Sequence, residues 1–306
     1  MAGIGRGVFG GGVNNSTGNS YNNIDYITIT TAGNAIDFGD LSTIRGIVGS
    51  CASSTRGVFG GGFNYWDGTA ATKNTIDYIT IATTGNASDF GDLTVARYAL
   101  SACSSEITGV FVGGSRYSDS VSFNTIDYIT IASTGNAADF GDLTSTRGPG
   151  ACASPTRGVF GGGATNVIDY ITIATPGNAT DFGDLTVTKG FRGCSSNTRG
   201  IFGGGSSSNV INYITIATTG NAIDFGDLTV ASNRAACSSL LRGIFGGGYT
   251  GSEINVMDYI TIATTGNAVD FGDLTLSRDG AAGLSDVHGG LDPAPDPPPP
   301  EPPAPT

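Results

Sequence analysis

The sequence predicts an all-β protein, a six-bladed β-propeller of four-stranded blades. The first observation is a phrase that recurs six times, in forms such as TRGVFGGG followed by IDYITIATTGNA and DFGDL. The second is its spacing, because one phenylalanine of the phrase recurs at intervals of 50, 52, 49, 42 and 43 residues. Repeats of roughly 40–50 residues with strand-like segments are typical of propeller blades. The six phenylalanines are Phe9, Phe59, Phe111, Phe160, Phe202 and Phe245.

Each repeat contains four segments with strand character, named here strands a to d. Strand a is a short run of small residues, such as Ala236–Ser238, and strand b is the segment GVFGG or GIFGG. Strand c, IDYITI, is rich in β-branched and aromatic residues, as strands usually are. The letters TGN then predict a hairpin turn, and DFGDL forms strand d. Strand c does not alternate between apolar and polar residues, which fits a sheet covered on both faces by neighbouring blades.

The two ends of the repeat region predict how the ring closes. The chain begins at strand b, with Arg6–Phe9, and its last repeat segment is an unpartnered strand a around Gly280–Ser285. This last segment can supply the missing inner strand of the first blade, and closure of the ring removes its exposed sheet edges. We therefore expect residues 1–290 to form the six-bladed β-propeller and residues 291–306 to form a separate tail.

The DFGD motif contains the same residues as the metal-binding turn of protein kinases. A kinase uses it once, beside a lysine, a glutamate and a catalytic aspartate, and no repeat here carries those partners. We expect Phe and Leu to pack inward, Gly to allow close packing or a bulge, and the aspartates to cap turns or pair with repeated arginines. Calcium binding by the paired carboxylates is the alternative, but the spacing of known calcium loops is missing, so we predict no metal site. The motif begins at Asp37, Asp89, Asp139, Asp181, Asp224 and Asp270.

Composition argues against several classes of function. The net charge is −12 and no basic stripe is present, so a nucleic-acid partner is not expected. The sequence has no apolar run of about 18 residues and no signal-peptide pattern at its start, so we expect no membrane insertion. One histidine and three glutamates leave few groups for acid–base or nucleophilic chemistry. We therefore expect a protein that is not an enzyme and uses no cofactor.

Five cysteines share one position in strand a, eight residues before the phenylalanine of strand b. Equivalent positions on neighbouring blades should lie about 10 Å apart, which is too far for a disulfide, so we expect small buried residues near the axis. A thiol ring that binds a soft metal is the alternative, and free thiols suit synthesis in a reducing cytoplasm. Gly283 is expected at this position in the closing strand, and His288 is expected to be solvated. The cysteines are Cys51, Cys103, Cys152, Cys194 and Cys237.

Variation in length is concentrated between strands b and c. This loop is longest in the first three blades, at Val13–Asn23, Phe63–Thr75 and Ser115–Thr125. Because b–c and d–a connections share one side of the ring, we expect a lopsided rim there, and binding residues usually occupy such loops. The alternative is that its aromatic residues only pack the loops onto the ring. The predicted binding residues are Tyr21, Phe63, Tyr65, Trp66, Asp67, Arg116, Tyr117, Asp119 and Phe123.

The tail is rich in proline and cannot join a sheet. We expect a polyproline II segment that docks on an aromatic-lined groove of a partner protein; a disordered solubilising tail is the alternative. The prolines expected to dock are Pro293, Pro295, Pro297, Pro298, Pro299, Pro300, Pro302 and Pro303.

The repeats resemble kelch repeats over about residues 1–290. The resemblance rests on the Gly pair after an apolar run (Val58–Gly61), the tyrosine of strand c (Tyr78), the aromatic residue of strand d (Phe90) and the arginine that follows (Arg97). Kelch repeats usually have Trp where Phe90 stands. The amino-acid sequence of the repeat is also similar to that of glycine-rich repeat proteins of marine tailed phages, and this resemblance implies a virion-associated protein.

These observations favour a non-enzymatic phage structural protein, a virion decoration or tail-fibre component made in the host cytoplasm. Its Pro-rich tail would attach it to other virion proteins, and its rim would bind a host-surface glycan or protein. A kelch-type carbohydrate-binding or protein-interaction module is the alternative. A propeller hydrolase would need a carboxylate cluster over the central channel, which the sequence does not predict beyond the repeated aspartates.

Overall fold

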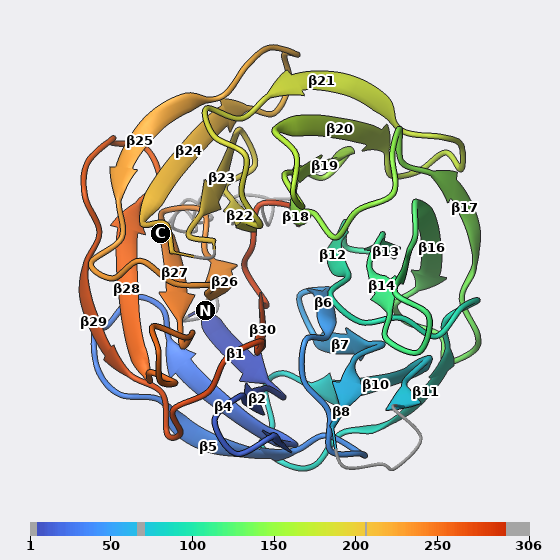
Figure 1. Ribbon diagram of the computed structural model, residues 1–306, viewed down its shortest axis with the longest axis vertical. Helices are drawn as coiled ribbons and strands as arrows, with labels where there is room; N and C mark the ends of the chain where they lie inside the picture. The colour runs from blue at the N-terminus through green and yellow to red at the C-terminus, as the bar shows by residue number, and fades with distance from the viewer. Residues whose placement is uncertain (1–4, 66–70, 206, 292–306) are drawn as a thin grey trace, which may run out of the picture.

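The computed structural model describes residues 5–65, 71–205 and 207–291, and these residues form a six-bladed β-propeller (Figure 1). The described residues contain strands but no helix. Six antiparallel four-stranded sheets stand around a central axis, each with strand a innermost and strand d outermost. The predicted fold class is therefore confirmed. The division into a propeller and a separate tail remains a prediction, because residues 292–306 lie outside the described residues.

The blades are numbered in chain order from the first strand b. Blade 1 contains β30 (Ala282–Ser285), β1 (Arg6–Gly10), β4 (Asn23–Thr28) and β5 (Ile36–Asp40). Blade 2 contains β6 (Gly49–Ala52), β7 (Arg56–Gly60), β10 (Thr75–Thr80) and β11 (Ser88–Asp92). Blade 3 contains β12 (Ser101–Ser104), β13 (Thr108–Val112), β16 (Thr125–Thr130) and β17 (Ala138–Asp142).

The second half of the ring repeats this pattern. Blade 4 contains β18 (Gly150–Ala153), β19 (Arg157–Gly161), β20 (Val167–Thr172) and β21 (Thr180–Asp184). Blade 5 contains β22 (Arg192–Ser195), β23 (Arg199–Gly203), β24 (Val210–Thr215) and β25 (Ile223–Asp227). Blade 6 contains β26 (Ala235–Ser238), β27 (Arg242–Gly246), β28 (Val256–Thr261) and β29 (Val269–Asp273).

The last strand of the chain closes the ring, as the sequence predicts. Strand β30 pairs antiparallel with β1, and Leu284 lies opposite Val8. In blade 2 the residue opposite Val58 is Cys51, so Leu284 holds the cysteine position in blade 1. The expectation that Gly283 takes this position is wrong by one residue.

The cysteines fill the interfaces between blades. The sulfur of Cys51 lies 2.7 Å from the point where a side chain on Gly109 of blade 3 would begin. Leu284 packs in the same way against Gly57 of blade 2. All five cysteines are buried and free, as predicted. Strand b thus needs glycine here because the neighbouring blade occupies the space of a side chain.

Hydroxyl groups link the inner strands of adjacent blades. The Ser104 hydroxyl of blade 3 donates to the carbonyl of Ala52 in blade 2 over 2.7 Å, and the Ala52 N–H donates back to that hydroxyl over 3.1 Å. Ser195 of blade 5 makes the same pair of bonds to Ala153 of blade 4. These bonds satisfy backbone groups that would otherwise be buried without partners at the axis.

The DFGD motif seals the outer edge of each blade. Gly91 has φ +147°, and a Cβ there would lie 2.4 Å from the carbonyl oxygen of Gly135 in the c–d turn of blade 3. That turn runs along strand d of blade 2: the Gly135 N–H donates to Phe90 O over 2.7 Å and the Ala137 N–H donates to Asp92 O over 2.8 Å. The glycine therefore permits the next blade to cover a sheet edge that would otherwise be free to pair with another chain.

Buried ion pairs join successive blades, but they do not involve the DFGD aspartates. The Arg97 guanidinium, which follows strand d of blade 2, lies 3.0 Å from the carboxylate of Asp127 in strand c of blade 3, and both side chains are fully buried. The Thr94 hydroxyl also donates to Asp127, over 2.6 Å. Asp89 of DFGD is exposed instead. In the described part of the chain no arginine lies within 4.0 Å of a DFGD carboxylate, so that expected pairing is wrong. The observed pairs are Arg45–Asp77, Arg97–Asp127, Arg147–Asp169, Arg234–Asp258 and Arg278–Asp25.

The junction between blades 4 and 5 replaces both members of this pair. Asn212 stands where the other strands c have aspartate, and Lys189 stands where four of the other junctions have arginine at the same distance after DFGD. The Thr186 hydroxyl donates to Asn212 over 2.9 Å, as its counterparts donate to aspartate. Loss of the buried carboxylate therefore accompanies loss of the buried guanidinium within one chain.

Candidate functional site

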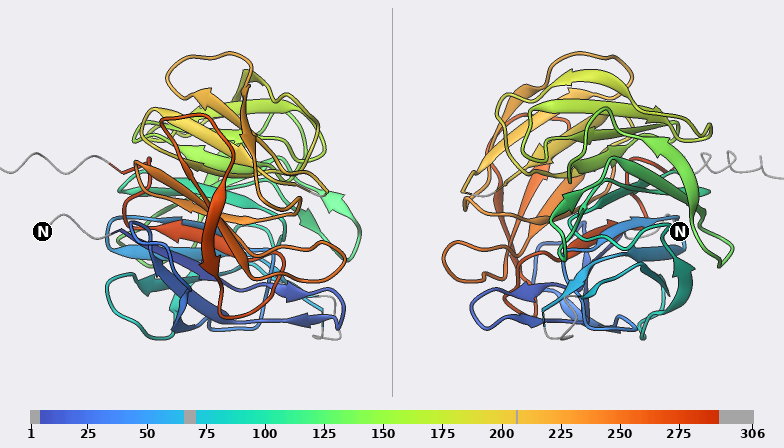
Figure 2. Two further views of the ribbon diagram at one scale, coloured as in Figure 1. Left: turned by 90° about the vertical axis from the view of Figure 1, so that its left-hand side faces the viewer. Right: turned by 45° about the vertical axis from the view of Figure 1, so that its right-hand side comes forward.

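The three long b–c loops project from one side of the ring, which we call the variable face (Figure 2). Each folds into a short hairpin: β2 (Val13–Asn14) with β3 (Asn19–Ser20), β8 (Phe63–Asn64) with β9 (Ala71–Thr72), and β14 (Ser115–Arg116) with β15 (Val121–Ser122). Backbone bonds fix them to the d–a loops, since Phe63 and Gly46 exchange two bonds of 2.9 Å. Ser115 and Tyr98 pair in the same way over 2.8 and 2.9 Å. The rim is therefore anchored to the rigid scaffold.

Four aromatic side chains from blades 2 and 3 meet on this face and form what we call the aromatic cluster: Phe63, Tyr65, Tyr98 and Tyr117. The ring centroids of Tyr65 and Tyr117 each lie 4.7 Å from that of Phe63. Tyr98 is 5.6 Å from Phe63 and 6.4 Å from Tyr117. Phe63 is buried at 2% exposure, whereas Tyr65 is 41% and Tyr117 51% exposed. A buried ring thus supports two tyrosines that remain about half exposed.

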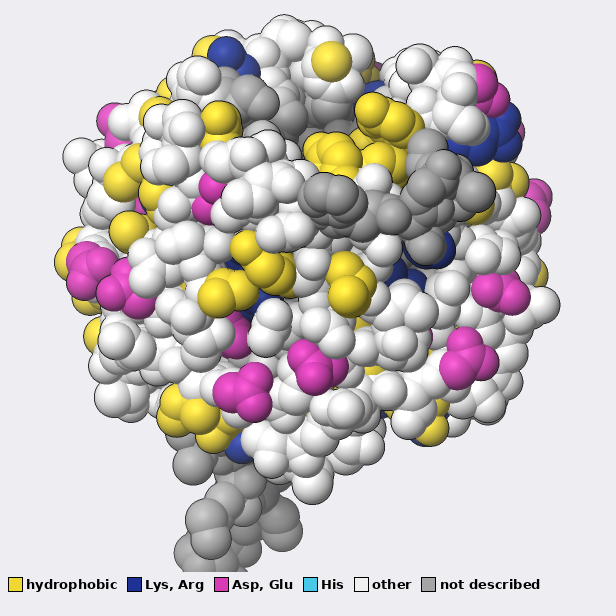
Figure 3. Space-filling model, turned by 60° about the horizontal axis from the view of Figure 1, so that its bottom comes forward, with side chains coloured by type: hydrophobic (Ala, Val, Ile, Leu, Met, Phe, Trp, Pro, Cys, Tyr) yellow, Lys and Arg dark blue, Asp and Glu magenta, His cyan; other side chains and the backbone are white. Residues whose placement is uncertain are grey.

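Partial burial affects the chemistry of the cluster. It raises the pKa of Tyr65, and the neighbouring Tyr117, Asp279 and Tyr98 add to this effect. The Tyr65 hydroxyl therefore stays neutral at physiological pH and can both donate and accept hydrogen bonds. Hydrophobic side chains gather near the centre of the variable face in an oblique view (Figure 3).

A charged pair lies beside the cluster on the hairpin of blade 3. The Arg116 guanidinium donates to both carboxylate oxygens of Asp119, over 3.1 and 2.6 Å, and its carbon lies 5.5 Å from the centroid of the Phe123 ring. These hydrogen bonds lower the pKa of Asp119 and raise the pKa of Arg116. Both side chains are about two-fifths exposed, so they remain accessible to a ligand.

The predicted binding residues divide into four groups. Phe63, Tyr65 and Tyr117 come together in the aromatic cluster, and Arg116, Asp119 and Phe123 lie next to it. Tyr21 makes no ring contact with the cluster among the described residues. The backbone carbonyl of Tyr21 accepts from the Arg45 N–H, as that of Phe123 accepts from the Arg147 N–H, so these backbone bonds fix where both residues lie in their loops. Trp66 and Asp67, like the tail prolines, lie outside the described residues.

Tyr98 belongs to the aromatic cluster but is not among the predicted binding residues. It lies in a d–a loop, outside the long b–c loops, directly after the buried Arg97. The residue after the corresponding arginine is glycine in two other junctions, at Gly46 and Gly148. An aromatic residue at this position was therefore the signal in the sequence from which Tyr98 could have been predicted.

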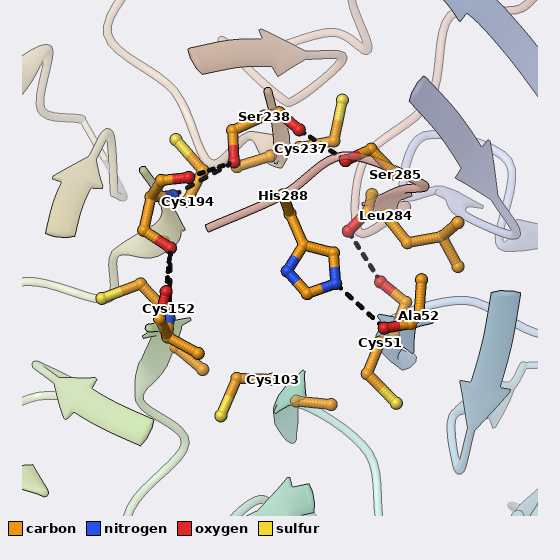
Figure 4. A pocket seen from close by; sticks show the side chains of 18 of the residues that line it. Cys51, Ala52, Cys103, Cys152, Cys194, Cys237, Ser238, Leu284, Ser285 and His288 are labelled. Atoms are coloured by element: carbon orange, nitrogen blue, oxygen red, sulfur yellow. Dashed lines mark hydrogen bonds between the residues drawn. The ribbon is translucent and has the colours of Figure 1, made fainter. Parts of the chain in front are cut away.

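The strands a line an axial channel that contains a cavity of about 50 Å³ (Figure 4). His288 points into this cavity and is only partly exposed, so its expected solvation is wrong. The chain crosses the axis after β30 and thereby brings His288 back into the ring. Burial raises the pKa of the thiols, to about 12 for Cys103 and Cys194, which leaves them protonated and unreactive.

A second cavity of about 30 Å³ lies nearer the variable face. Arg192 is the charged residue in its lining, and burial lowers the pKa of this arginine. In the described ranges, the axial cavities included, no group of three or more His, Cys, Asp or Glu side chains is placed to hold a metal ion. Those ranges also contain no helix long and apolar enough to cross a membrane.

No protein-family model matches the chain, and no curated protein sequence is significantly similar to it.

Proposed function

We propose that this protein is a non-enzymatic recognition protein whose aromatic cluster binds a glycan on a host surface. The observation that carries the proposal is the exposure of two tyrosines, Tyr65 and Tyr117, that both pack on the buried Phe63. Open aromatic faces cover the apolar side of a sugar ring, while nearby polar groups bond its hydroxyls. Arg116 and Asp119 supply such groups next to the cluster.

The rigidity of the scaffold supports this role. The hairpins are bonded to the d–a loops, and those loops are held by the buried ion pairs between blades. A preorganised surface loses less conformational freedom when it binds, so a small exposed cluster can bind specifically.

We expect Tyr117→Ala to weaken binding to a glycan-array ligand about tenfold or more, or about 1.4 kcal/mol, because it removes one open face of the cluster. Tyr249→Ala is the matched control: Tyr249 is 39% exposed in the b–c loop of blade 6, outside the cluster. Titration calorimetry with the best array ligand measures both variants. The glycan proposal would be rejected if the two variants lost the same amount of glycan affinity, or if neither the wild type nor the control bound any glycan. A protein ligand whose binding is lost only in Tyr117→Ala would indicate protein recognition instead.

The placement in a virion rests on the resemblance of the repeats to glycine-rich proteins of marine tailed phages and on the composition of the tail. In this proposal the propeller decorates the capsid or a tail fibre, and residues 292–306 attach it to other virion proteins. Its kelch-like repeats serve as the scaffold.

Deletion of residues 292–306 should abolish incorporation into particles without changing the thermal stability of the propeller. Quantitative immunoblotting of purified particles measures incorporation, and calorimetry of the free protein provides the control. Particles that incorporate the truncated protein at the wild-type level would show that the tail is not the attachment.

A further inference from the structure

The chain does not leave the ring directly after its closing strand. Residues 286–291, which we call the axial plug, cross the axis (Figure 4) on the side opposite the variable face (Figure 2). At its start, the Arg6 N–H of β1 donates to Asp286 Oδ1 over 2.7 Å. Further on, the Gly289 N–H donates to the carbonyl of Ser195 in blade 5 over 3.0 Å. The plug is thus bonded to blades on both sides of the channel.

His288 holds the centre of the plug through both ring nitrogens. The Gly290 N–H donates to Nδ1 over 3.0 Å, so Nδ1 carries no proton. Nε2 therefore bears the hydrogen and donates to the carbonyl of Ala52 in blade 2 over 2.9 Å. The Ser104 hydroxyl of blade 3 lies 3.3 Å from the same nitrogen. This pattern specifies one neutral tautomer of the imidazole.

We propose that the axial plug is an acid-released latch, in which protonation of His288 expels the plug and opens the channel. A proton on Nδ1 would face the Gly290 N–H, so the bond that shapes the plug would become a contact between two donors. The charge would also lie in a cavity lined by thiols, serine hydroxyls and small apolar residues. A charged imidazole is solvated only when the plug moves out of the channel.

The charged groups near His288 set the direction of the effect. Burial lowers the pKa of His288; the Ala52 bond and the distant Glu106 carboxylate only partly oppose this. Glu106 is itself bonded to the Ser54 hydroxyl over 2.6 Å. Asp286 on the plug has a raised pKa from burial, and Arg6 faces it. The strand a thiols stay neutral because burial raises the pKa values of all five.

The sign follows from the lowered pKa. A released His288 titrates near its ordinary value of 6.5, so below that pH the open state binds a proton that the closed state resists. The closed state is therefore fully favoured above about pH 6.5 and loses stability progressively as the pH falls towards the lowered value. Burial raises the pKa of Asp286 above its ordinary value of 3.8, so protonation of Asp286 as the pH falls favours the closed plug and opposes the effect of His288.

The experiment uses the fact that His288 is the single histidine in the chain. Nitrogen-15 NMR of histidine-labelled protein should show the proton on Nε2 and a titration below pH 6.5. After correction for intrinsic exchange rates, amide hydrogen exchange at Gly289 and Gly290 should become about tenfold or more faster when the pH is lowered from about 7.5 to about 5. His288→Gln cannot titrate and should abolish that acceleration.

Three results would each overturn the proposal: a proton on Nδ1, titration at or above 6.5, or wild-type exchange that does not accelerate in acid. Acceleration that persists in His288→Gln would also reject it. The nitrogen-15 spectra and the exchange rates of the wild type need no variant, so the proposal stays testable if His288→Gln fails to fold.

Discussion

Replacement of Asp127 by Asn should lower the free energy of unfolding by about 3–5 kcal/mol. The change keeps the shape of the side chain but leaves the Arg97 guanidinium without its carboxylate at a junction where both side chains are fully buried. Removal of one partner from a buried pair is costly because the other charge stays desolvated. Urea unfolding, followed by circular dichroism, measures the difference.

Asp89→Asn is the matched control, because Asp89 is a repeated aspartate of DFGD that is exposed. Its effect should stay within about 0.5 kcal/mol. The double variant Arg97→Lys and Asp127→Asn copies the pair found between blades 4 and 5 and should recover part of the loss, because Lys189 is only partly buried there. Equal effects of Asp127→Asn and Asp89→Asn would contradict a structural role for the buried pairs.

Gly91→Ala should cost several kcal/mol, because about 1–3 kcal/mol of backbone strain adds to a similar cost of overpacking. The φ angle of +147° disfavours any side chain, and the new Cβ would lie 2.4 Å from the backbone oxygen of Gly135. Backbone atoms cannot move aside as a flexible side chain can, so the c–d turn of blade 3 would lift from the edge of blade 2. The urea midpoint measures the loss.

Gly190→Ala provides the control for loss of a glycine as such. A Cβ at Gly190 meets no atom within 4 Å, and the residue does not have a positive φ. Its stability should stay close to wild type. If Gly91→Ala were as stable as Gly190→Ala, the proposed sealing of the blade edge by DFGD would be wrong.

The repeat made the fold predictable, because six copies of one phrase specify the same four strands and the two chain ends specify the closure. It could not show which aspartate pairs with which arginine. Positions that repeat together are alike in every blade, so only a blade that departs from the pattern carries information. Lys189 and Asn212 change together at one junction, and that coupled change was the signal for the ion pair.

Errors near the chain end have a different physical cause. The closing strand lacks a cysteine, so its register could not be aligned by sequence, and Leu284 rather than Gly283 takes the buried position. His288 follows no repeat and stands next to two glycines, which is typical of a solvated loop. Only the crossing of the axis, a property of the closed ring, brings it against Ala52.

The candidate site was predictable in part. Loop length and rare aromatic residues identified Phe63, Tyr65 and Tyr117, which meet in the structure. Tyr98 joins them from a d–a loop, a connection whose length changes by only one residue between blades, because this loop pairs with the hairpin of blade 3. Contacts of this kind depend on how one blade is placed beside the next, which sequence spacing does not specify.

The recognition role is tested most directly by a structure of the protein bound to the strongest ligand from the glycan array. We predict that the sugar lies on the open faces of Tyr65 and Tyr117, with hydroxyl groups bonded to Arg116 or Asp119. A ligand seated on the opposite side of the ring, or on the variable face away from these residues, would contradict the proposal.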